Sequence, residues 1–255
     1  MNGGDLSVAV VGGGIGGLAA ALSLLRAGFD VQVFERASAL MEVGAGIQIS
    51  PNASRLLHRL GLAAALDQTG VRSEAVHQRR WHDGRTLQRA PLGEAGEAAI
   101  GAPYYHFHRA DVLKAPADAL AAFKGWHPKV GAIIGAVDET FIWALFDRAP
   151  LDRWSVGRVT RLGDACHAML PFMAQGAAQS IEDGATLAAC LLQDSAADVP
   201  SALRRYEALR RPRATRLQEM ARANKTRFHL SDGPEQQARD TLLATRGDRT
   251  IEALG

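Results

Sequence analysis

Three glycines near the start of the chain have the spacing of a phosphate-binding turn. Gly12, Gly14 and Gly17 lie in the run GGGIGG and fit the pattern GxGxxG. The first glycine of this pattern permits a tight turn, the second lets the backbone approach a pyrophosphate, and the third allows a helix to pack closely on a strand. Free amide groups at the start of that helix then face the phosphates. The spacing indicates a dinucleotide site, and a glycine turn that binds nothing is the alternative.

An acidic residue follows at the position where a dinucleotide site needs one. Glu35 ends the short apolar run VQVF. A carboxylate there can accept hydrogen bonds from the hydroxyl groups of the adenosine ribose. It would also repel a 2′-phosphate, which argues against NADP in this site. Glu35 therefore favours the ligand-binding interpretation of the glycine turn.

A second glycine-containing stretch can also bring backbone close to a ligand. Residues 158–185 read RVTRLGDACHAMLPFMAQGAAQSIEDGA. Asp164, at the end of an expected strand, could bind a hydroxyl chain such as ribityl or ribose. Gly176 and Ala177 could direct helix amide groups at a developing anion. The alternative, that Asp164 caps a helix, is equally consistent with the spacing.

The elements expected around the first motif form a βαβ unit. Residues 6–11 (LSVAVV) are typical of a buried parallel strand, and the Ala- and Leu-rich residues 18–27 of a helix that ends at Gly28. A second strand follows at residues 31–34. Strand, glycine turn, helix and strand in this order are what a βαβ crossover requires.

The rest of the chain alternates between short apolar runs and helical patterns. A glycine-rich loop is expected at residues 38–50, and Pro212 could break the long Arg-rich helix near the end. The other expected elements are a helix at 52–60, a hairpin around Asp83-Gly84, a helix at 108–120, strands at 140–146 and 159–162, helices at 177–192 and 199–230, and a polar, loosely ordered tail at 231–255.

The composition excludes several classes of protein. The 255 residues carry a formal net charge of only +2, which gives no electrostatic reason to expect nucleic-acid binding. The two cysteines form no disulfide framework and no metal-ligand cluster, so a reducing compartment is expected. No window is long and apolar enough to span a bilayer, and the N-terminus lacks a basic signal-peptide region. We expect a cytoplasmic protein with no membrane partner and no metal, for which an oligomeric state is open.

The two glycine-containing stretches together resemble a known family. GGGIGGLAAALSLLRAGFDVQVFER and GDACHAMLPFMAQGAAQSIED are similar to the single-component FAD-dependent aromatic hydroxylases of the salicylate hydroxylase and 6-hydroxynicotinate 3-monooxygenase type. GAGIQISPNA, HRADVL and GWHPKV add to the likeness, which runs in two blocks from about residue 6 to about residue 230. The resemblance implies FAD as cofactor and NAD(P)H as co-substrate.

The resemblance also implies a role for each matching residue. The glycine turn would hold the FAD diphosphate, Glu35 the adenosine ribose, and Asp164 the ribityl or diphosphate region. Gly176 and Ala177 would line the flavin edge, where a helix N-terminus stabilises the anionic reduced flavin. The implied cofactor-binding residues are Gly12, Gly14, Ile15, Gly17, Glu35, Arg36, Gly46, Ile47, Arg109, Asp164, Pro171, Gly176 and Ala177.

The sequence departs from the family in the middle. Complete members have a long block between the helix of Arg109 and the stretch like residues 123–130, with an Ala-Asp-Gly motif and most of the substrate sheet. Here Leu120 is followed almost at once by Phe123, and no Ala-Asp-Gly motif follows a strand. We interpret this as an internal deletion, which should leave strand edges unpaired. It also puts the walls of a substrate cavity and the exclusion of water in doubt.

The expected fold class is α/β. It would comprise a Rossmann-like FAD/NAD(P)-binding domain with a βαβ unit and a mostly parallel sheet, a reduced antiparallel substrate sheet and a C-terminal helical segment. The expected divisions are 1–70, the first part of the FAD domain; 71–107, the partial substrate sheet; 108–122, a helix of the FAD domain; 123–150, the substrate-domain remnant; 151–197, the second part of the FAD domain; and 198–255, the C-terminal helix and tail.

No catalytic base can be assigned from the sequence. His106, His108 and His167 could serve, but a lone histidine is more often structural. Cys166 could be a reactive thiol, although a buried space-filling residue is the commoner case. The arginines of residues 204–216 are expected to form a solvated helix face, with an anionic partner as the minor alternative.

Three functions remain open at this point. The first is FAD-dependent hydroxylation of a small aromatic carboxylic acid with NAD(P)H and O2. The second is a non-catalytic or unstable FAD-binding remnant of such an enzyme. The third is an NAD-dependent dehydrogenase that uses the first motif alone, against which the second glycine-containing stretch argues.

Overall fold

The computed structural model describes residues 6–38, 46–107, 123–136, 145–193 and 198–246. The expected helix at 108–120, which carries Arg109, lies outside these residues, as does most of the expected strand at 140–146. Among the helices that are described, none combines the length and apolar character needed to cross a bilayer.

The predicted βαβ unit is present at the N-terminus. Strand β1 (Ser7–Val11), helix α1 (Ile15–Arg26) and strand β2 (Asp30–Phe34) follow one another, and the two strands pair in parallel with Ser7 opposite Asp30 and Val11 opposite Phe34. Gly28 has a φ of +86°, as a helix-terminating glycine requires. The first motif therefore lies between a strand and a helix, as its chemistry demands.

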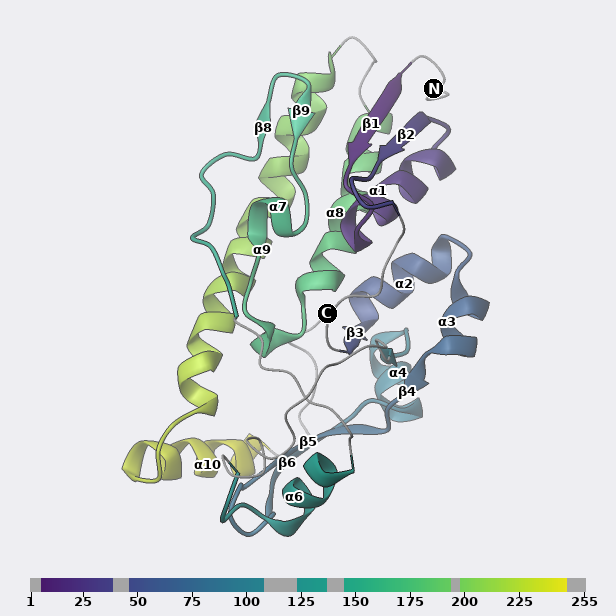
Figure 1. Cartoon of the computed structure of the whole chain (residues 1–255). Helices are drawn as coiled ribbons and strands as arrows, with labels where there is room; N and C mark the ends of the chain where they lie inside the picture. Colours follow the sequence, from purple (N-terminus) through teal and green to yellow (C-terminus); the bar gives the residue numbers. More distant parts are fainter. Residues whose placement is uncertain (1–5, 39–45, 108–122, 137–144, 194–197, 247–255) are drawn as a thin grey trace.

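Two long helices from the second half of the chain cover this unit. Helix α8 (Gly176–Gln193) packs along α1, and helix α9 (Val199–Phe228) packs on the other side of α8 (Figure 1). Their shared core is continuous with β1 and includes Val10, Leu24, Leu187, Leu203 and Tyr206. The predicted break at Pro212 is wrong, because α9 continues through it. Buried residues on both sides of the proline, among them Arg210 and Ala214, hold the helix together.

A small antiparallel sheet lies beside α8. Strand β7 (Tyr105–Phe107) pairs with β3 (Ile47–Ile49) on one side and with β4 (Val71–Arg72) on the other. The predicted helix at 52–60 is confirmed as α2 (Pro51–Arg59), whereas α3 (Ala63–Thr69) and α4 (Glu94–Ile100) were not expected.

The far end of the molecule is formed by a hairpin and short helices. Strands β5 (Ala75–Arg79) and β6 (Thr86–Pro91) enclose Asp83-Gly84, which confirms the predicted hairpin. Helix α10 (Pro234–Arg246) packs on β6, and α6 (Pro128–Gly135) lies at the same end (Figure 1). The expectation of a loose tail is wrong as far as residue 246. Arg80 of the hairpin region binds the nearly buried Asp240 of α10 at 2.9 Å and thereby holds that helix in place.

Parallel pairing is confined to two strands in the described part of the chain. The strand expected at 159–162 is β9 (Val159–Thr160), which pairs antiparallel with β8 (Ser155–Val156) and not with β1. Val11 of β1 is 87% exposed, although parallel strands are normally covered on both faces. Among the described strands β1 pairs with β2 alone, so its other edge is open, as the missing middle predicts. The short helix α7 (Asp164–His167) and the 3-10 turn η2 (Pro171–Met173) lead from β9 to α8.

The crossing of α1 and α8 depends on Gly184. A Cβ atom at this position would lie 2.7 Å from the backbone nitrogen of Ala20 and 2.8 Å from its Cα. We predict that Gly184→Ala lowers the free energy of unfolding by about 1–3 kcal/mol, because the helices must separate. Urea unfolding measures this value.

Gly131→Ala is the matched control for this substitution. Gly131 is also a helical glycine, but a Cβ atom there meets nothing within 4 Å. Alanine should raise stability by about 0.5–1 kcal/mol at that position through helix propensity. Equal effects of the two substitutions would contradict the proposed close approach of α1 and α8.

Candidate functional site

One cavity brings the two sequence motifs together. It has a volume of about 1110 Å³ and runs from the turn between β1 and α1 to the start of α8. Typical cavities for organic ligands occupy about 300–1,000 Å³, so the space suits a large cofactor. Most of the predicted cofactor-binding residues line it, namely Gly12, Gly14, Ile15, Gly17, Gly46, Ile47, Asp164, Pro171, Gly176 and Ala177.

The glycine turn has the geometry that a phosphate cradle requires. Gly12 has a φ of +110°, and its amide donates to the carbonyl of Phe34 at 2.8 Å. A Cβ atom at Gly17 would lie 1.9 Å from the carbonyl oxygen of Gly12, so no side chain fits there. At Gly14 a Cβ atom would meet nothing within 4 Å. The first and third glycines are thus required by the protein itself, while the second leaves space for a ligand.

Glu35 is tied to this turn by backbone amides. One carboxylate oxygen accepts from the amide of Gly13 at 2.6 Å, and the other accepts from the amide of Ala37 at 2.7 Å. These two hydrogen bonds, led by that from Ala37, hold the pKa of Glu35 below its usual value. Each oxygen keeps a second lone pair with which to accept from a ribose hydroxyl. Glu35 and Arg36 are exposed and are not among the residues that line the cavity, although Glu35 binds Gly13, which lies between the lining residues Gly12 and Gly14.

The second motif places Asp164 on the opposite wall. Asp164 is the first residue of α7 and is exposed, whereas the residue that caps this helix is Gly163, with no side-chain cap. The alternative of Asp164 as an N-cap is therefore wrong. Gly163 has a φ of +60°, a conformation that favours glycine and turns the chain sharply into the cavity.

The start of α8 opens into the same space. The first amide groups of a helix have no partner within the helix, and those of α8 belong to Gly176 and Ala177, which both line the cavity. A Cβ atom at Gly176 would meet nothing within 4 Å, so the space in front of this helix end is free. Pro171 of η2 lines the cavity beside it. This end can stabilise negative charge on a ligand.

The loop at Gly46 and Ile47 is held by the small sheet. Ile47 pairs with Phe107 across β3 and β7, and the neighbouring Gln48 accepts a hydrogen bond from the hydroxyl of Tyr104 at 2.7 Å. Burial raises the pKa of Tyr104 to about 12, so the phenol stays protonated at neutral pH and donates. Gln48 lines the cavity and was not predicted.

A buried polar network behind the cavity centres on Arg210 of α9. Its Nε donates to Asp183 Oδ1 at 2.7 Å, one terminal nitrogen pairs with Glu182, and the other donates to the side-chain oxygen of Gln179 at 2.7 Å. Arg210 is 5% exposed, and Asp183 and Gln179 are fully buried. The guanidinium group therefore joins α9 to the middle of α8.

Two arms lead from this arginine to the two halves of the cavity wall. On one side, Glu182 accepts from Asn52 of α2, and Gln175, next to Gly176, donates to Ser50 at 3.0 Å. On the other side, Asp183 accepts from the amide of Gly163 at 2.8 Å. The network thus reaches both the helix start and the loop of the second motif.

Paired charges keep both carboxylates ionised. Burial by itself would raise the pKa of Asp183, but the hydrogen bond from His167 and the charge of Arg210 lower it below the usual 3.8. Burial likewise opposes ionisation of Glu182, and Arg210 and Arg213 lower its pKa below 4.5. Two carboxylates facing two guanidinium groups leave the network without excess charge, as buried ionised groups require.

The other residues considered for catalysis lie elsewhere. His106 bonds Ser73 on the small sheet, His167 bonds Asp183, and neither lines the cavity; His108 lies outside the described residues. Burial raises the pKa of the Cys166 thiol well above its usual value, which makes it unreactive. Cys166, His167 and Asp183 lie within 4.8 Å of one another, but Arg210 already neutralises Asp183 and disfavours a cation there.

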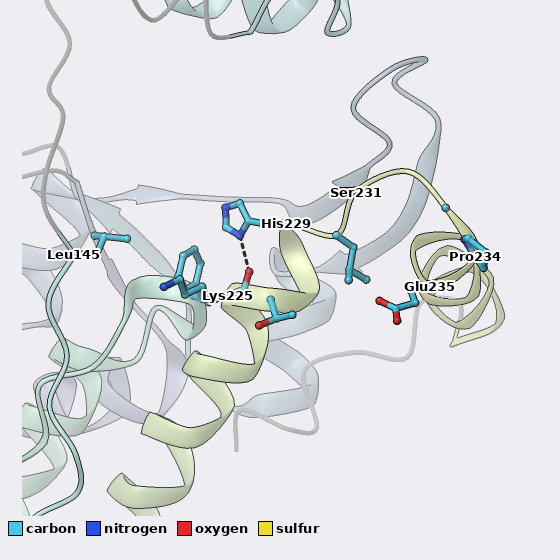
Figure 2. Close-up of a pocket in the computed structure, with 10 residues that line it drawn as sticks. Leu145, Lys225, His229, Ser231, Pro234 and Glu235 are labelled. Carbon is cyan, nitrogen blue, oxygen red and sulfur yellow. Dashed lines mark hydrogen bonds between the residues drawn. The ribbon is translucent and has the colours of Figure 1, made fainter.

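A second hollow adjoins the cavity across η2. It has a volume of about 930 Å³ and lies where α9 meets α10 (Figure 2). Pro171 lines the first cavity, and the next residue, Phe172, lines this hollow. Lys225 and Glu235 bring opposite charges to its wall, so it shows no preference for an anion.

Some of the residues that were missed have a partial signal in the sequence. Asp183 and Glu182 interrupt an Ala-rich helix with adjacent charges, which is unusual on a buried face. Arg210 could not be separated from its neighbours, because several arginines share that helix. The expectation of a solvated arginine face is wrong for Arg210, which is buried, and Arg213 is half-buried on Glu182.

Comparison with known proteins extends over nearly the whole chain. Residues 5–124 and 129–221 match a family described as FAD binding domain. The chain is 32% identical to 3-amino-4-hydroxybenzoate 2-monooxygenase PtmB3 of Streptomyces platensis, covering 93% of this chain and 92% of the relative. It is 29% identical to 6-hydroxynicotinate 3-monooxygenase of Pseudomonas fluorescens, covering 85% and 90%. Among solved structures, Klebsiella pneumoniae HpxO complexed with FAD and uric acid superposes with a TM-score of 0.84 at 21% identity, covering 99% of this chain and 95% of HpxO.

The comparisons also locate the missing block. The alignment with the Streptomyces platensis protein extends over 366 positions, more than the 255 residues of this chain, so a large part of that relative has no counterpart here. The family match is interrupted between residues 124 and 129, close to the point at which the sequence predicts the deletion.

The charge on Asp183 should make stability depend on pH. A carboxylate whose pKa is lowered by folding stabilises the protein above its unfolded-state pKa, and the gain is lost as pH falls through the folded-state pKa. Near pH 7, Asp183→Asn should cost about 3–5 kcal/mol, because it removes one of the two carboxylates that pair with the buried guanidinium of Arg210. The difference in melting temperature between the wild type and this variant should shrink below about pH 4.

Glu219→Gln, on the exposed face of α9, serves as the control for the Asp183→Asn substitution. A difference that stays constant from pH 7 to pH 3 would show that Asp183 is not ionised.

Proposed function

Because the chain belongs to the FAD binding domain family, we propose that the cavity between α1 and α8 holds FAD and that the protein is an FAD-dependent oxidoreductase acting on a small aromatic acid. The observation that carries the proposal is that one cavity is lined by both glycine-containing motifs, which lie about 150 residues apart in the sequence. A dinucleotide whose central diphosphate lies on the first motif and whose electron-accepting ring lies on the second matches such a cavity.

The residues present fit this cofactor. The turn from Gly12 to Gly17 would hold the diphosphate on the first amides of α1, and Glu35 would accept from the adenosine ribose. Asp164 would accept from the ribityl hydroxyls. The start of α8 at Gly176 would stabilise negative charge on the pyrimidine end of the ring. Arg109 remains a predicted contact from outside the described residues.

The reaction proposed is hydroxylation of a small aromatic acid with NAD(P)H and O2. Support comes from the relatives, which are named for activity on hydroxybenzoates and hydroxynicotinate. Bound FAD would supply the redox chemistry, accepting electrons from NAD(P)H and passing them to oxygen. The chain itself would orient the flavin ring between Pro171 and Gly46 and stabilise negative charge on that ring at the start of α8. The walls of the cavity would exclude water from the flavin.

A second candidate is an FAD-binding protein that no longer hydroxylates. Its support is the two-stranded sheet of β1 and β2, whose open edge lies along the cavity, together with the missing block of sequence. A cavity open at this edge admits water, which favours loss of electrons to oxygen without substrate oxidation. The dehydrogenase alternative is weaker, because a dehydrogenase needs no second glycine motif in the cavity.

We also propose how the chain is divided into parts and where the protein is located. The segments 1–70, 108–122 and 151–197 would form the FAD domain, residues 71–107 and 123–150 the reduced substrate part, and residues 198–255 the helix and tail. Free, buried Cys166 and Cys190 are compatible with a reducing compartment, so we propose the cytoplasm. The other partners proposed are small molecules, with no nucleic acid and no membrane among them.

Cofactor content tests the proposed function directly. The purified chain should be yellow and release one FAD per chain on denaturation. A hydroxylase should oxidise NAD(P)H faster with a hydroxybenzoate present and form a hydroxylated product. Oxidation that yields hydrogen peroxide but no product would favour the second candidate. A folded chain without flavin, even after incubation with FAD, would refute both.

Gly14→Ala should separate ligand binding from folding. A methyl group at Gly14 meets no protein atom within 4 Å, but it would occupy the space where a diphosphate approaches the turn. We expect an FAD dissociation constant raised at least about tenfold, with an unchanged melting temperature of the apoprotein. Fluorescence titration and thermal unfolding measure the two quantities. Gly131→Ala, equally open and far from the cavity, is the control, and unaltered FAD affinity in Gly14→Ala would contradict the assigned diphosphate position.

A further inference from the structure

Asp183 holds both ends of the short turn that carries Asp164. Its Oδ2 accepts from the amide of Gly163 at 2.8 Å and lies 2.6 Å from Nε2 of His167. Gly163 precedes Asp164, and His167 is the last residue of α7. One carboxylate oxygen therefore fixes the residue before Asp164 and the end of the helix that Asp164 begins.

The geometry determines what each group donates. A carboxylate only accepts hydrogen bonds, so His167 carries a proton on Nε2. The other oxygen of Asp183 accepts from Nε of Arg210 at 2.7 Å. Both Asp183 and His167 have fully buried side chains. Hydrogen bonds to a buried charge are costly to lose, because water cannot replace the missing donor.

Asp164 differs in its exposure from the buried residues that hold its turn. Its side chain is exposed and lines the cavity, whereas Gly163 and His167 on either side of the turn are buried. Gly163 adopts a backbone conformation at φ +60° and ψ −142° that only glycine adopts readily, and Asp183 holds its amide. The direction of the Asp164 carboxylate therefore depends on groups that do not reach the cavity.

We propose that His167 and Asp183 are positioning residues for the cofactor, which aim the Asp164 carboxylate at the hydroxyl chain of FAD. This inference rests on the proposed function and adds to it a role for the only described histidine that bonds Asp183. His167 acts through the placement of the turn and does not touch the ligand. The turn requires the hydrogen bond from His167 to Asp183 and not the imidazole ring as such.

Two substitutions at His167 separate the hydrogen bond from packing. Glutamine can place a side-chain N–H near the position of Nε2 and donate to Asp183, whereas leucine has similar bulk and no donor. We expect His167→Leu to raise the FAD dissociation constant about tenfold and His167→Gln to stay within about threefold of the wild type. Fluorescence titration of the apoprotein with FAD measures both.

Amide hydrogen exchange of the apoprotein provides a readout that needs no cofactor. Exchange at residues 163–167 should become faster in His167→Leu and remain near the wild-type rate in His167→Gln. Leu217→Ala is the control for lost stability, because Leu217 is buried in α9 and does not line the cavity. This variant should melt at a lower temperature without a change in FAD affinity or in exchange at the turn.

A double-mutant cycle tests whether His167 acts through Asp164. If it does, the variant Asp164→Asn/His167→Leu should bind FAD no more weakly than Asp164→Asn alone. Additive losses would overturn the proposal, as would equal FAD affinities for His167→Leu and His167→Gln, or an effect of Leu217→Ala on affinity as large as that of His167→Leu. A wild-type chain that binds no FAD would refute the proposed function as well, so the two failures are distinguishable.

Discussion

The fold depends on pairing the buried guanidinium of Arg210 with the carboxylates of Asp183 and Glu182. A charge in this position is tolerated only when it is fully paired, and here four of its hydrogen bonds go to α8. Through Glu182 the pairing reaches Asn52 in the first half of the chain, and through Asp183 it reaches Gly163 in the second half. Glu182 and Asp183, which are adjacent on α8, thus fix the positions of the two halves of the cavity wall relative to each other.

The same arrangement explains how a chain without its middle can keep a binding site. The core between α1, α8 and α9 is built from segments on both sides of the missing block, and it includes buried residues from β1 to α9. The two-stranded sheet of β1 and β2, by contrast, has lost part of its coverage, as the exposure of Val11 shows. A cofactor bound along β1 would cover part of that edge, so binding and stability should be coupled.

The sequence predicted the motif-bearing parts of the fold well, because glycine spacing and apolar runs are local signals. Gly12, Gly17 and Gly28 lie where a turn or helix end requires them, and the βαβ unit follows from them. The sequence mispredicted two features, namely that α9 continues through Pro212 and that the chain forms helix α10. Both depend on residues distant in the sequence, because α9 is held by Asp183 and α10 by Arg80. The role of Arg210 could not be predicted from the sequence for the same reason. Its role is visible only once α8 and α9 lie side by side, as Figure 1 shows.

A crystal structure of the chain with FAD bound would show whether the two motifs hold one cofactor between them. We expect the diphosphate against the amides at Gly14 and Ile15, the ribityl chain beside Asp164, and the flavin ring in front of Gly176. Asp183 should still hold the amide of Gly163, with Arg210 unmoved. An FAD bound away from the start of α8, or one that leaves the Asp164 carboxylate without contact, would contradict it.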